Sequence, residues 1–504
     1  MKKVTTFLLL FFFAFRVSAQ SVLSGKITDA DTGEALPGAS IQLTGSVRGT
    51  TSGGNGAYLL RNVAAGAYEV RISYVGFETS VQTVDLRSGD ATLNAALRRS
   101  TYQADEVVVS ATRATRQTGM AFTNVGAEEI RKQNLGQDLP VLLNFQPSLV
   151  STSDAGAGVG YTGFRIRGSD ATRINVTLNG IPYNDAESQG TFWVNMPDFA
   201  SSVSSIQIQR GAGTSTNGAG AFGATVNIQT NEFRRDAYAE TNHSVGSFNT
   251  MKNNVLVGTG LLGGKFTVDG RLSRLKSDGF IDRASSDLKS FYLSGAYFGK
   301  KSFVRLNVFS GQETTFQAWE GVPEARLRGD REGMLAFIER NGLSDAAAAN
   351  LLNSNSRTYN VYTYDNQVDN YQQDHYQLLT SHQLARGLAL NVNLHYTKGR
   401  GYFEQYREGD KLSNYGLPNV TLGDTAIQRT DLIRRRWLDN DFYGTVFSLD
   451  YDSYKRLKVS LGGGWNRYTG KHFGEVIWAR MSTGDIRHRY YDNDATKTDF
   501  NLYG

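Results

Sequence analysis

Residues 205–211 read SIQIQRG and residues 218–228 read GAGAFGATVNI, two alternating segments joined through a glycine-rich stretch. Apolar side chains at every second position are typical of a half-buried strand. The second segment also contains the spacing GxGxxG, which cradles a pyrophosphate when a helix follows it. Here the alternation runs on to Thr230, so a strand is predicted and no helix N-terminus is available to bind phosphate. The glycines instead allow tight turns and close backbone packing.

Two further motifs lie upstream, FRIRG at 164–168 and RINVTLNGIP at 173–182, and short helices are predicted at 127–133 and 138–144. In order and spacing the four motifs resemble the plug domain of TonB-dependent outer-membrane receptors. The usual forms there are RxRG, a strand ending DGxP, IEVLRGP and YGxxAxGGxINI. The departures from these forms affect the expected ligand contacts and charge network, and they fall at Asn179, Gln207, Gln209, Ala212 and Ala224.

The resemblance gives roles to several residues of the expected plug domain, 112–231. In the family, plug arginines meet carboxylates on the inner wall of the barrel, which implies a plug lock made by Arg165, Arg167, Gly168, Arg210 and Gly211. An arginine inside a barrel is costly unless it is paired or reached by water. The other interpretation is that these arginines are solvated on a surface. The expected plug turns use Asn179, Gly180, Pro182, Gly218, Gly220 and Gly223.

The N-terminal segments have the pattern of an exported protein. Residues 1–19 combine two lysines, a short apolar run and small residues before an expected cut after Ala19, as in a secretory signal peptide. Residues 22–98 alternate short strands with turn residues and predict an immunoglobulin-like β-sandwich. Their order of motifs resembles the carboxypeptidase-regulatory-like domain, which implies a periplasmic spacer without catalytic residues.

A short valine-rich segment follows the sandwich at residues 105–111. Consecutive valines favour an extended backbone that can pair with another chain's sheet edge. By pattern alone this is an ordinary strand. Between a spacer and a plug it resembles a TonB box, which implies that TonB binds Asp105, Glu106, Val107, Val108, Val109, Ser110 and Ala111.

Residues 237–504 alternate with period two and predict about ten strands. Tight turns are expected at 262–264, 299–301, 385–387 and 454–456, and long loops at about 312–373, 399–440 and 469–496. Short turns at one end and long loops at the other are typical of an outer-membrane barrel. Alternation alone leaves open which face meets lipid. The resembled receptors close a barrel of 22 strands, so the sequence is expected to be truncated.

The fold class predicted is therefore mainly β: an immunoglobulin-like sandwich, an α+β plug and the first ten or so strands of a 22-stranded antiparallel transmembrane barrel. The long loops supply the ligand candidates, and a helix capped by Ser344 is expected at 345–352 within the first. Aromatic rings with arginines suit flat anionic ligands such as ferric chelates, although the same residues also serve as interfacial anchors. The candidates are Trp319, Tyr402, Tyr406, Arg435 and Trp437.

Composition narrows the function classes. The 53 Lys+Arg and 48 Asp+Glu residues leave a net charge of only +5, which argues against nucleic acid as a partner. The absence of cysteine excludes thiol catalysis and Cys-bound metals, and the six histidines show no metal-ligand spacing. No cofactor, metal or enzymatic activity is expected.

The resemblance implies TonB-dependent import of a scarce nutrient across the outer membrane, with an iron complex (siderophore or haem) placed first. The expected partners are TonB with its ExbB/ExbD energy source, outer-membrane lipid and a small nutrient ligand. The expected location is the outer membrane, with the N-terminal domains in the periplasm. Two alternatives stay open: an oligosaccharide or peptide importer of the starch-utilisation type, and a surface-binding β-protein that does not transport.

Overall fold

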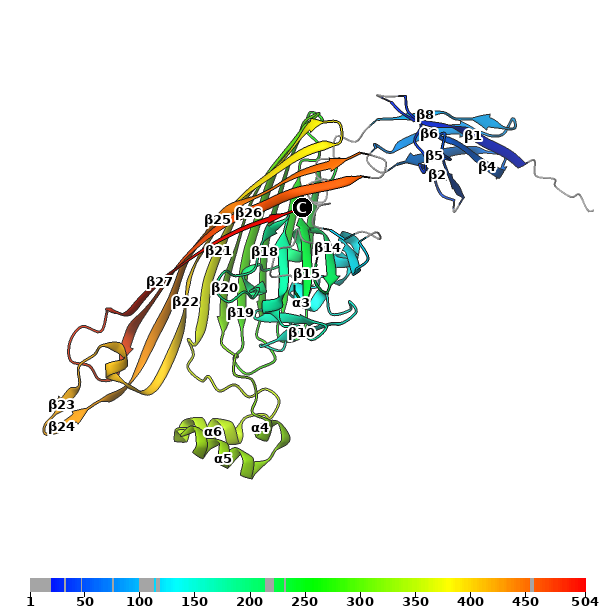
Figure 1. Ribbon diagram of the computed structural model, residues 1–504. Coiled ribbons are helices and arrows are strands. Elements are labelled where there is room, and N and C mark those ends of the chain that lie inside the picture. Colours follow the sequence, from blue (N-terminus) through cyan, green and yellow to red (C-terminus); the bar gives the residue numbers. More distant parts are fainter. Residues whose placement is uncertain are drawn as a thin grey trace, which may run out of the picture. The chain divides into compact units, whose positions relative to one another are not determined.

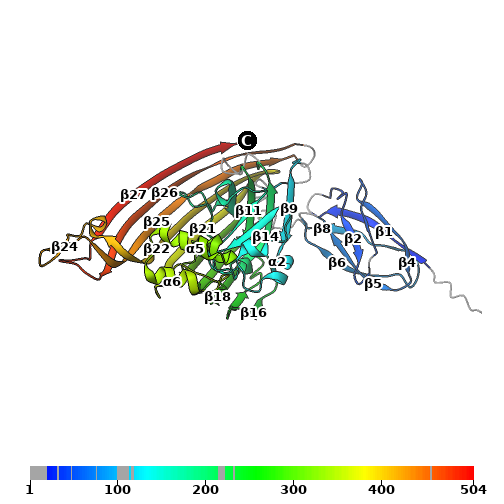
Figure 2. The same cartoon turned by 90° about the horizontal axis from the view of Figure 1, so that it is seen from below.

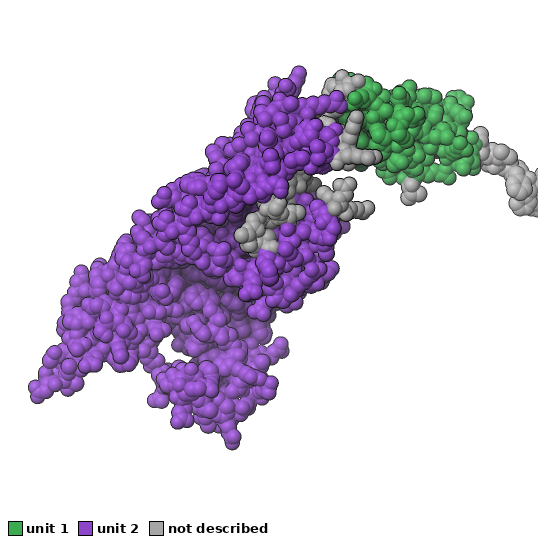
Figure 3. All heavy atoms as spheres, viewed as in Figure 1, with its two compact units in different colours: residues 1–103 green, residues 104–504 purple. Residues whose placement is uncertain are grey.

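The computed structural model describes residues 20–30, 33–46, 48–74, 77–98, 113–114, 118–213, 222–230, 233–453 and 457–504. The chain divides into two compact units, residues 1–103 and 104–504 (Figure 3). The expected signal peptide at 1–19 and the expected TonB box at 105–111 lie outside the described residues.

The first unit is a sandwich of two four-stranded sheets, as predicted. In one sheet β1 pairs antiparallel with β4 and parallel with β7 and β8; the other has the order β3-β2-β5-β6. Alternate residues such as Leu23, Ile27, Ile41 and Ile72 form its core. The strand bounds are β1 Gln20–Asp29, β2 Ser40–Leu43, β3 Gly49–Thr51, β4 Ala57–Ala64, β5 Ala67–Ser73, β6 Ser80–Asp85, β7 Ala91–Thr92 and β8 Ala95–Leu97.

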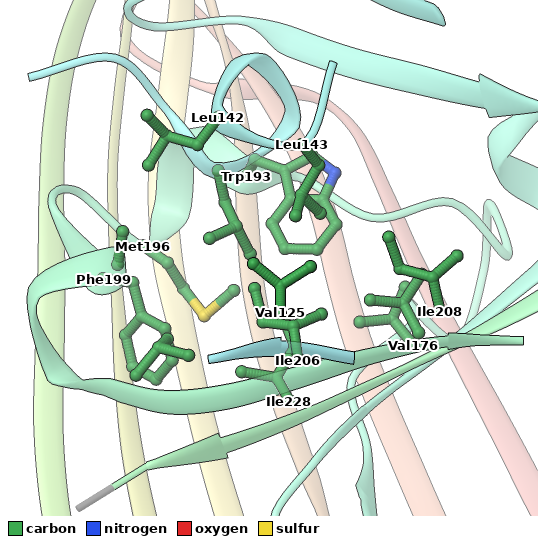
Figure 4. Packing of buried hydrophobic residues seen from close by; sticks show 14 of the residues in the cluster. Val125, Leu142, Leu143, Val176, Trp193, Met196, Phe199, Ile206, Ile208 and Ile228 are labelled. Atoms are coloured by element: carbon green, nitrogen blue, oxygen red, sulfur yellow. The ribbon is translucent and has the colours of Figure 1, made fainter. Parts of the chain in front are cut away.

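Residues 118–230, here named the inner domain, form an α+β unit around a five-stranded sheet of order β13-β12-β15-β14-β9. Its core packs aromatic and aliphatic side chains such as Trp193, Phe199 and Ile206 (Figure 4). The bounds are β9 Ala121–Gly126, α2 Ala127–Gln133, α3 Leu139–Leu142, β10 Leu149–Ser153, β11 Thr162–Ile166, η1 Ala171–Arg173, β12 Ile174–Leu178, β13 Ile181–Pro182, η2 Trp193–Asn195, η3 Phe199–Ser202, β14 Val203–Arg210 and β15 Ala224–Thr230.

The predictions for the inner domain hold in its secondary structure. The first predicted helix is α2, and the second is the shorter α3. The segment after the glycine-rich stretch is the strand β15, so no helix stands where a nucleotide site would need one. A Cβ at Gly223 would lie 2.6 Å from Cβ of Ser169, so this glycine is required by close packing.

Ten antiparallel strands in chain order form one sheet that curves along a side of the inner domain (Figures 1 and 2). Three predicted turns join neighbouring strands, and the fourth, at 454–456, lies outside the described residues. The bounds are β16 Tyr238–Val245, β17 Met251–Gly258, β18 Phe266–Ser277, β19 Ser286–Phe298, β20 Ser302–Phe316, β21 Val368–Ala385, β22 Leu388–Lys411, β25 Arg429–Asp452, β26 Lys458–Ala479 and β27 Arg489–Tyr503.

The two faces of the ten-stranded sheet have inverted polarity compared with a water-soluble sheet. On β22, Leu390 and Leu394 are exposed, whereas Asn391 and Asn393 are buried on the side of the inner domain. The same holds for β18, where Leu272 is exposed and Arg271 is buried. Apolar residues outside and polar residues inside are typical of a lipid-facing barrel wall. The structure thus settles the orientation that alternation left open.

The long loops predicted from polarity were placed too widely. The connection predicted at 399–440 is wrong over most of its length, because β22 runs to Lys411 and β25 begins at Arg429; it holds η5 Leu412–Tyr415 and the hairpin β23 Val420–Leu422 with β24 Thr425–Ile427. The 469–496 segment is likewise mostly strand. Strand ends that project past an apolar band carry polar residues on both faces, so they resemble loops in sequence.

The connection between β20 and β21 holds three helices with a small core of their own around Leu351 and Tyr359. They are α4 Glu324–Arg328, α5 Arg331–Asn341 and α6 Asp345–Asn353. The last confirms the predicted helix, and the Ser344 hydroxyl accepts a hydrogen bond from the backbone N–H of Ala347 at 3.3 Å. Within the described ranges, no helix has both the length and the apolar character needed to cross a membrane.

Candidate functional site

A cavity lies between the inner domain and the buried face of β20–β26. The inner domain contributes the turn between β12 and β13 with the residues after it, and the sheet contributes inward-facing side chains of five strands. Glu313 near the end of β20 and Asp369 near the start of β21 place the cavity toward the ends that carry the long connections. The cavity therefore lies on the same side as the helical connection α4–α6.

The period of β21 explains how one strand supplies so much of this lining. Asp369, Tyr371, Gln373, His375 and Gln377 all line the cavity, because residues two apart share one face of a strand. The tight β12–β13 turn meets this face. Its Asn179 amide donates to Gln377 Oε1 at 2.9 Å.

Several polar side chains of the lining are held by hydrogen bonds between the inner domain and the sheet or along β21. The Tyr161 hydroxyl donates to Asp369, and the Tyr183 hydroxyl lies 3.4 Å from Gln373 Oε1. His375 contacts the same Gln373 oxygen at 3.1 Å and stacks on Phe309 with ring centroids 4.5 Å apart. The side chains that face the cavity are thus largely fixed before a ligand arrives, which lowers the entropic cost of binding.

Four of the five predicted ligand residues come together beside this cavity. Tyr402 lines it, and its ring lies 4.7 Å from that of Trp437 and 4.3 Å below the Arg435 guanidinium. The ring of Trp319 packs against that of Phe403, with centroids 5.7 Å apart, and so joins the group. Tyr406 lies apart from them, beside Tyr364. Four of the predicted residues therefore form one cluster. They lie at strand ends and in one connection, and not in two long loops as predicted. Their role in ligand binding stays a prediction.

The inner domain is anchored to the sheet by a buried ion cluster that sequence analysis missed. Asp198 is 5% exposed; its carboxylate lies 2.8 Å from Lys252 Nζ of β17 and 3.4 Å from Arg271 Nη1 of β18. Asn254 and Ser273 also donate to it. Its backbone is left-handed (φ 50°), which an Asp tolerates better than most residues. The available signal was one cation at an inward position of each of two neighbouring alternating strands, Lys252 on β17 and Arg271 on β18.

Two inner-domain carboxyls have opposite pKa shifts. Burial alone would raise the pKa of Asp198, but Arg271 and Lys252 hold it at about 2, so the anchor stays charged at neutral pH. Asp138 is buried, accepts from the Thr162 hydroxyl at 3.0 Å and has no cation beside it in the described part of the chain, and burial raises its pKa to about 8. Asp138 is therefore largely protonated in neutral solution.

A close backbone approach completes the contact between inner domain and sheet. A Cβ at Gly311 of β20 would lie 2.1 Å from the carbonyl oxygen of Asn195 and 2.6 Å from Cδ of Pro197. Ser290 of β19 donates to the Pro197 carbonyl at 2.7 Å. The segment 195–198 is thus pressed directly against the wall, and Gly311 leaves the space for it.

The predicted plug-lock residues lie within the inner domain. Arg210 is buried and donates to the Pro147 carbonyl at 2.9 Å and to Thr123 Oγ1 at 2.8 Å, while Arg165 and Arg167 are exposed. The Arg167 guanidinium donates to the Arg210 carbonyl at 3.3 Å. Gly168 and Gly211 directly follow these two arginines in the chain. Among the described ion pairs, those between inner domain and sheet involve Asp198 and Glu187. The lock role of the arginines stays a prediction.

The predicted turn residues are placed in part. Asn179 and Gly180 both have positive φ (55° and 79°), and Pro182 ends the short strand β13. Asn179 also accepts from the Thr230 backbone N–H at 3.0 Å, which ties the turn to the end of β15. Gly218 and Gly220 lie outside the described residues, as does the expected TonB-binding segment 105–111. No group of three potential metal ligands occurs in the part of the chain that the structure describes.

Comparison with known families assigns both N-terminal domains. A CarboxypepD_reg-like domain model matches residues 23–109, and the TonB-dependent Receptor Plug Domain model matches residues 114–225. The inner domain is a TonB-dependent receptor plug domain. Both resemblances stated from the motifs are thereby confirmed. No curated protein matches the chain.

Solved receptors share the fold of plug domain and barrel wall. The ferric-catecholate import receptor Fiu of E. coli K12 is 16% identical with a TM-score of 0.52, over 76% of this chain and 56% of Fiu. FpvA of P. aeruginosa, solved with pyoverdine and iron, is 12% identical with a TM-score of 0.50, over 78% and 49%. The ferric citrate transporter FecA is 15% identical with a TM-score of 0.50, over 77% and 53%.

These neighbours are outer-membrane barrels, and the chain spans about half of their length. At such identities the likeness establishes the fold: a plug domain held against ten strands of a receptor barrel wall.

Proposed function

We propose that this chain belongs to an outer-membrane receptor that takes up a scarce nutrient and is driven by TonB. The observation that carries the proposal is the polarity of the ten-stranded sheet. It exposes leucines such as Leu272 and Leu394 and turns buried polar side chains toward the plug domain. A wall of this kind suits lipid outside and a polar interior, which is the setting in which a plug controls a passage.

The cavity links ligand binding to the plug. A ligand against Tyr371 and His375 of the wall also meets Tyr183 and Asn184, which follow the β12–β13 turn of the plug domain. Contact with both parts can shift the plug relative to the wall. In this proposal the shift releases residues 105–111 to the periplasm, where TonB pairs with them as an added strand.

The work for opening comes from the inner membrane. Each charge that crosses it supplies ~2.3 kcal/mol per 100 mV, so a few protons moved through ExbB/ExbD suffice to disrupt part of the plug. The first candidate cargo is an iron complex, a siderophore or haem. It is supported by the aromatic lining of the cavity and by the ferric ligands named for the solved receptors of this fold.

A second candidate is an oligosaccharide or peptide importer of the starch-utilisation type. The carboxypeptidase-regulatory-like match at residues 23–109 favours it, because that module also occurs in such receptors. Growth with iron complexes, haem or glycans as the limiting nutrient separates the two candidates.

The test of TonB dependence is the substitution Val108→Pro within residues 105–111. Proline removes a backbone donor and so blocks addition of this segment to a sheet. We expect uptake of the limiting nutrient to be lost while cell-surface binding stays at the wild-type level. Thr101→Pro, in the link before this segment, is the matched control and is expected to transport normally. Unchanged uptake by the Val108→Pro variant would contradict the proposal and favour a surface-binding protein without transport.

A further inference from the structure

The cavity between plug domain and wall has no cationic side chain among the described residues that line it. Three carboxylates line it instead: Asp185, Glu313 and Asp369. Asp185 has a structural role, because it accepts from the backbone N–H groups of Glu187 and Ser188 in a turn. The other two come from neighbouring strands of the wall and face the open space.

Glu313 and Asp369 have no described counter-ion, in contrast to the buried Asp198, which has two. Glu313 is 1% exposed, and its hydrogen-bond donor is the Thr315 hydroxyl at 3.3 Å. Asp369 accepts from the Tyr161 hydroxyl. Neither takes part in an ion pair in the described part of the chain, whereas the buried Asp198 has two cations. A buried carboxyl group without a counter-charge is costly in its ionised form and holds a proton unless a cation reaches it, so a cationic ligand group can take the place of that proton.

Three further atoms at this cavity are buried polar atoms that have no hydrogen-bond partner among the described residues. They are Asn195 Oδ1, His395 Nδ1 and the Tyr468 hydroxyl, on side chains 8%, 6% and 4% exposed. His395 Nε2 lies 2.9 Å from Asn466 Oδ1, so Nε2 carries the proton and Nδ1 is an acceptor. Asn195 Oδ1 is also an acceptor. Two of these three atoms can only accept a hydrogen bond, and the Tyr468 hydroxyl can donate or accept one. A ligand group that donates hydrogen bonds can therefore satisfy all three.

Aromatic rings complete this lining. Tyr371, Phe442 and Tyr468 present ring surface that a cation binds through the quadrupole of the ring. Two guanidinium groups lie at the edge of the cavity, Arg435 over the Tyr402 ring at 4.3 Å and Arg436 over the Phe403 ring at 5.3 Å, on the side away from Glu313 and Asp369 in the chain order of the strands. Arg435 is paired with Glu404 at 2.7 Å, and Arg434 donates to Gln405 at 2.9 Å.

We infer that this cavity binds a positively charged, hydrogen-bond-donating group, such as a protonated amine carried by the imported ligand. The inference rests on the proposed function and narrows it. It disfavours catecholate-type and citrate-type iron complexes as cargo, because their negative charge would lie beside two carboxyl groups that have no counter-ion among the described residues. It also departs from the anionic ligand that the arginines of the sequence suggested.

The test compares three iron complexes that differ in charge. The probes are ferrioxamine B, which carries a free ammonium group, the neutral ferrichrome and the anionic ferric citrate. Binding to the purified full chain in detergent is measured by titration calorimetry. We expect ferrioxamine B to bind at least tenfold more tightly than ferrichrome, and ferric citrate not to saturate.

Charge-neutral variants then locate the effect. Glu313→Gln and Asp369→Asn keep the shape of the side chains and are each expected to weaken ferrioxamine B binding about tenfold, while ferrichrome is unaffected. Asp374→Asn is the control, because Asp374 lies on the same strand but does not line the cavity and bonds Ser310 and Gln372. Protease resistance of each variant verifies folding, and having two charge variants keeps the test decisive if one is unstable.

Equal or tighter binding of ferric citrate, or no saturable binding of ferrioxamine B, overturns the inference. So does loss of binding in the Asp374→Asn variant to the same degree as in the other two. These titrations need no TonB, so failure of transport in the Val108→Pro experiment and failure of charge selectivity here are distinguished.

Discussion

Asp198 shows how a single residue can join two parts of this fold. Its carboxylate is buried between the plug domain and the wall, with Lys252 and Arg271 of the wall on one side and the hydroxyl donor Ser201 of the plug domain on the other. Burying charges costs free energy that their attraction only partly returns. The cluster therefore specifies how the plug domain sits against β17 and β18 more than it adds net stability.

Removing the charge of Asp198 is expected to loosen the plug domain. In the Asp198→Asn variant two buried cations lose their counter-ion, a change that typically costs about 3–5 kcal/mol. We expect faster hydrogen exchange in residues 121–210 and earlier trypsin cleavage, while the ten-stranded sheet keeps its protection. Asp287→Asn, whose partners Arg274 and Lys276 are half exposed, is the control and is expected to change little. If the Asp198→Asn variant exchanges its amide hydrogens at the wild-type rate, Asp198 does not anchor the plug domain.

Strands were predictable from the sequence because alternation is a local property. The count of about ten and the three described tight turns follow from residues such as those at 385–387. The outward direction of each face was not predictable, since period two is the same whichever side is apolar. The lengths of β22 and β25 were also missed, because polar strand ends and loops share a composition.

Placing a charge on the outer face of one strand tests its exposure to lipid. We expect Leu394→Arg on β22 to impair membrane insertion, because an arginine near the middle of the apolar band costs about 2–4 kcal/mol. Leu335→Arg is a matched control, since Leu335 on α5 and Leu394 are both 47% exposed. The measurement is the fraction of protein that resists urea extraction from membranes. Equal resistance of the two variants would contradict a lipid-facing role for this face.

The plug domain as a whole carries opposing pH dependences. Asp198, with a folded pKa of about 2, contributes stability above the ordinary value near 4 that is lost as the pH falls toward 2. Asp138, with a folded pKa of about 8, binds a proton that the unfolded chain releases, so the free energy of unfolding falls as the pH rises from about 4 to about 8.

The substitution Asp138→Asn is expected to remove the second of these dependences. One proton sets an upper limit of about 1.4 kcal/mol per pH unit on the slope. The urea midpoint of the plug domain in the wild type should therefore fall between pH 5 and pH 8, and that of the variant should fall less. Parallel midpoint curves would show that Asp138 is already ionised in the folded state.

Much of the molecule's organisation was predictable from the sequence, but the partners of individual charges were not. The plug motifs gave the correct domain because turn residues and strand spacing are local. The arginine Arg210 was expected to face the wall, yet its described bonds are with Pro147 and Thr123. Which cation meets which carboxylate depends on contacts more than forty residues apart, as between Asp198 and Lys252. Ion pairs between residues so far apart in the chain can be identified only from the folded structure.

The apolar outer face of the ten-stranded sheet matters before the chain reaches any membrane. Leucines such as Leu272 and Leu394 are exposed on this face. In water, a contiguous apolar surface of this kind drives copies of the chain to associate. If the chain travels to the outer membrane, it crosses an aqueous compartment in that state. Copies of the chain in water are then expected to associate through this face until lipid covers it.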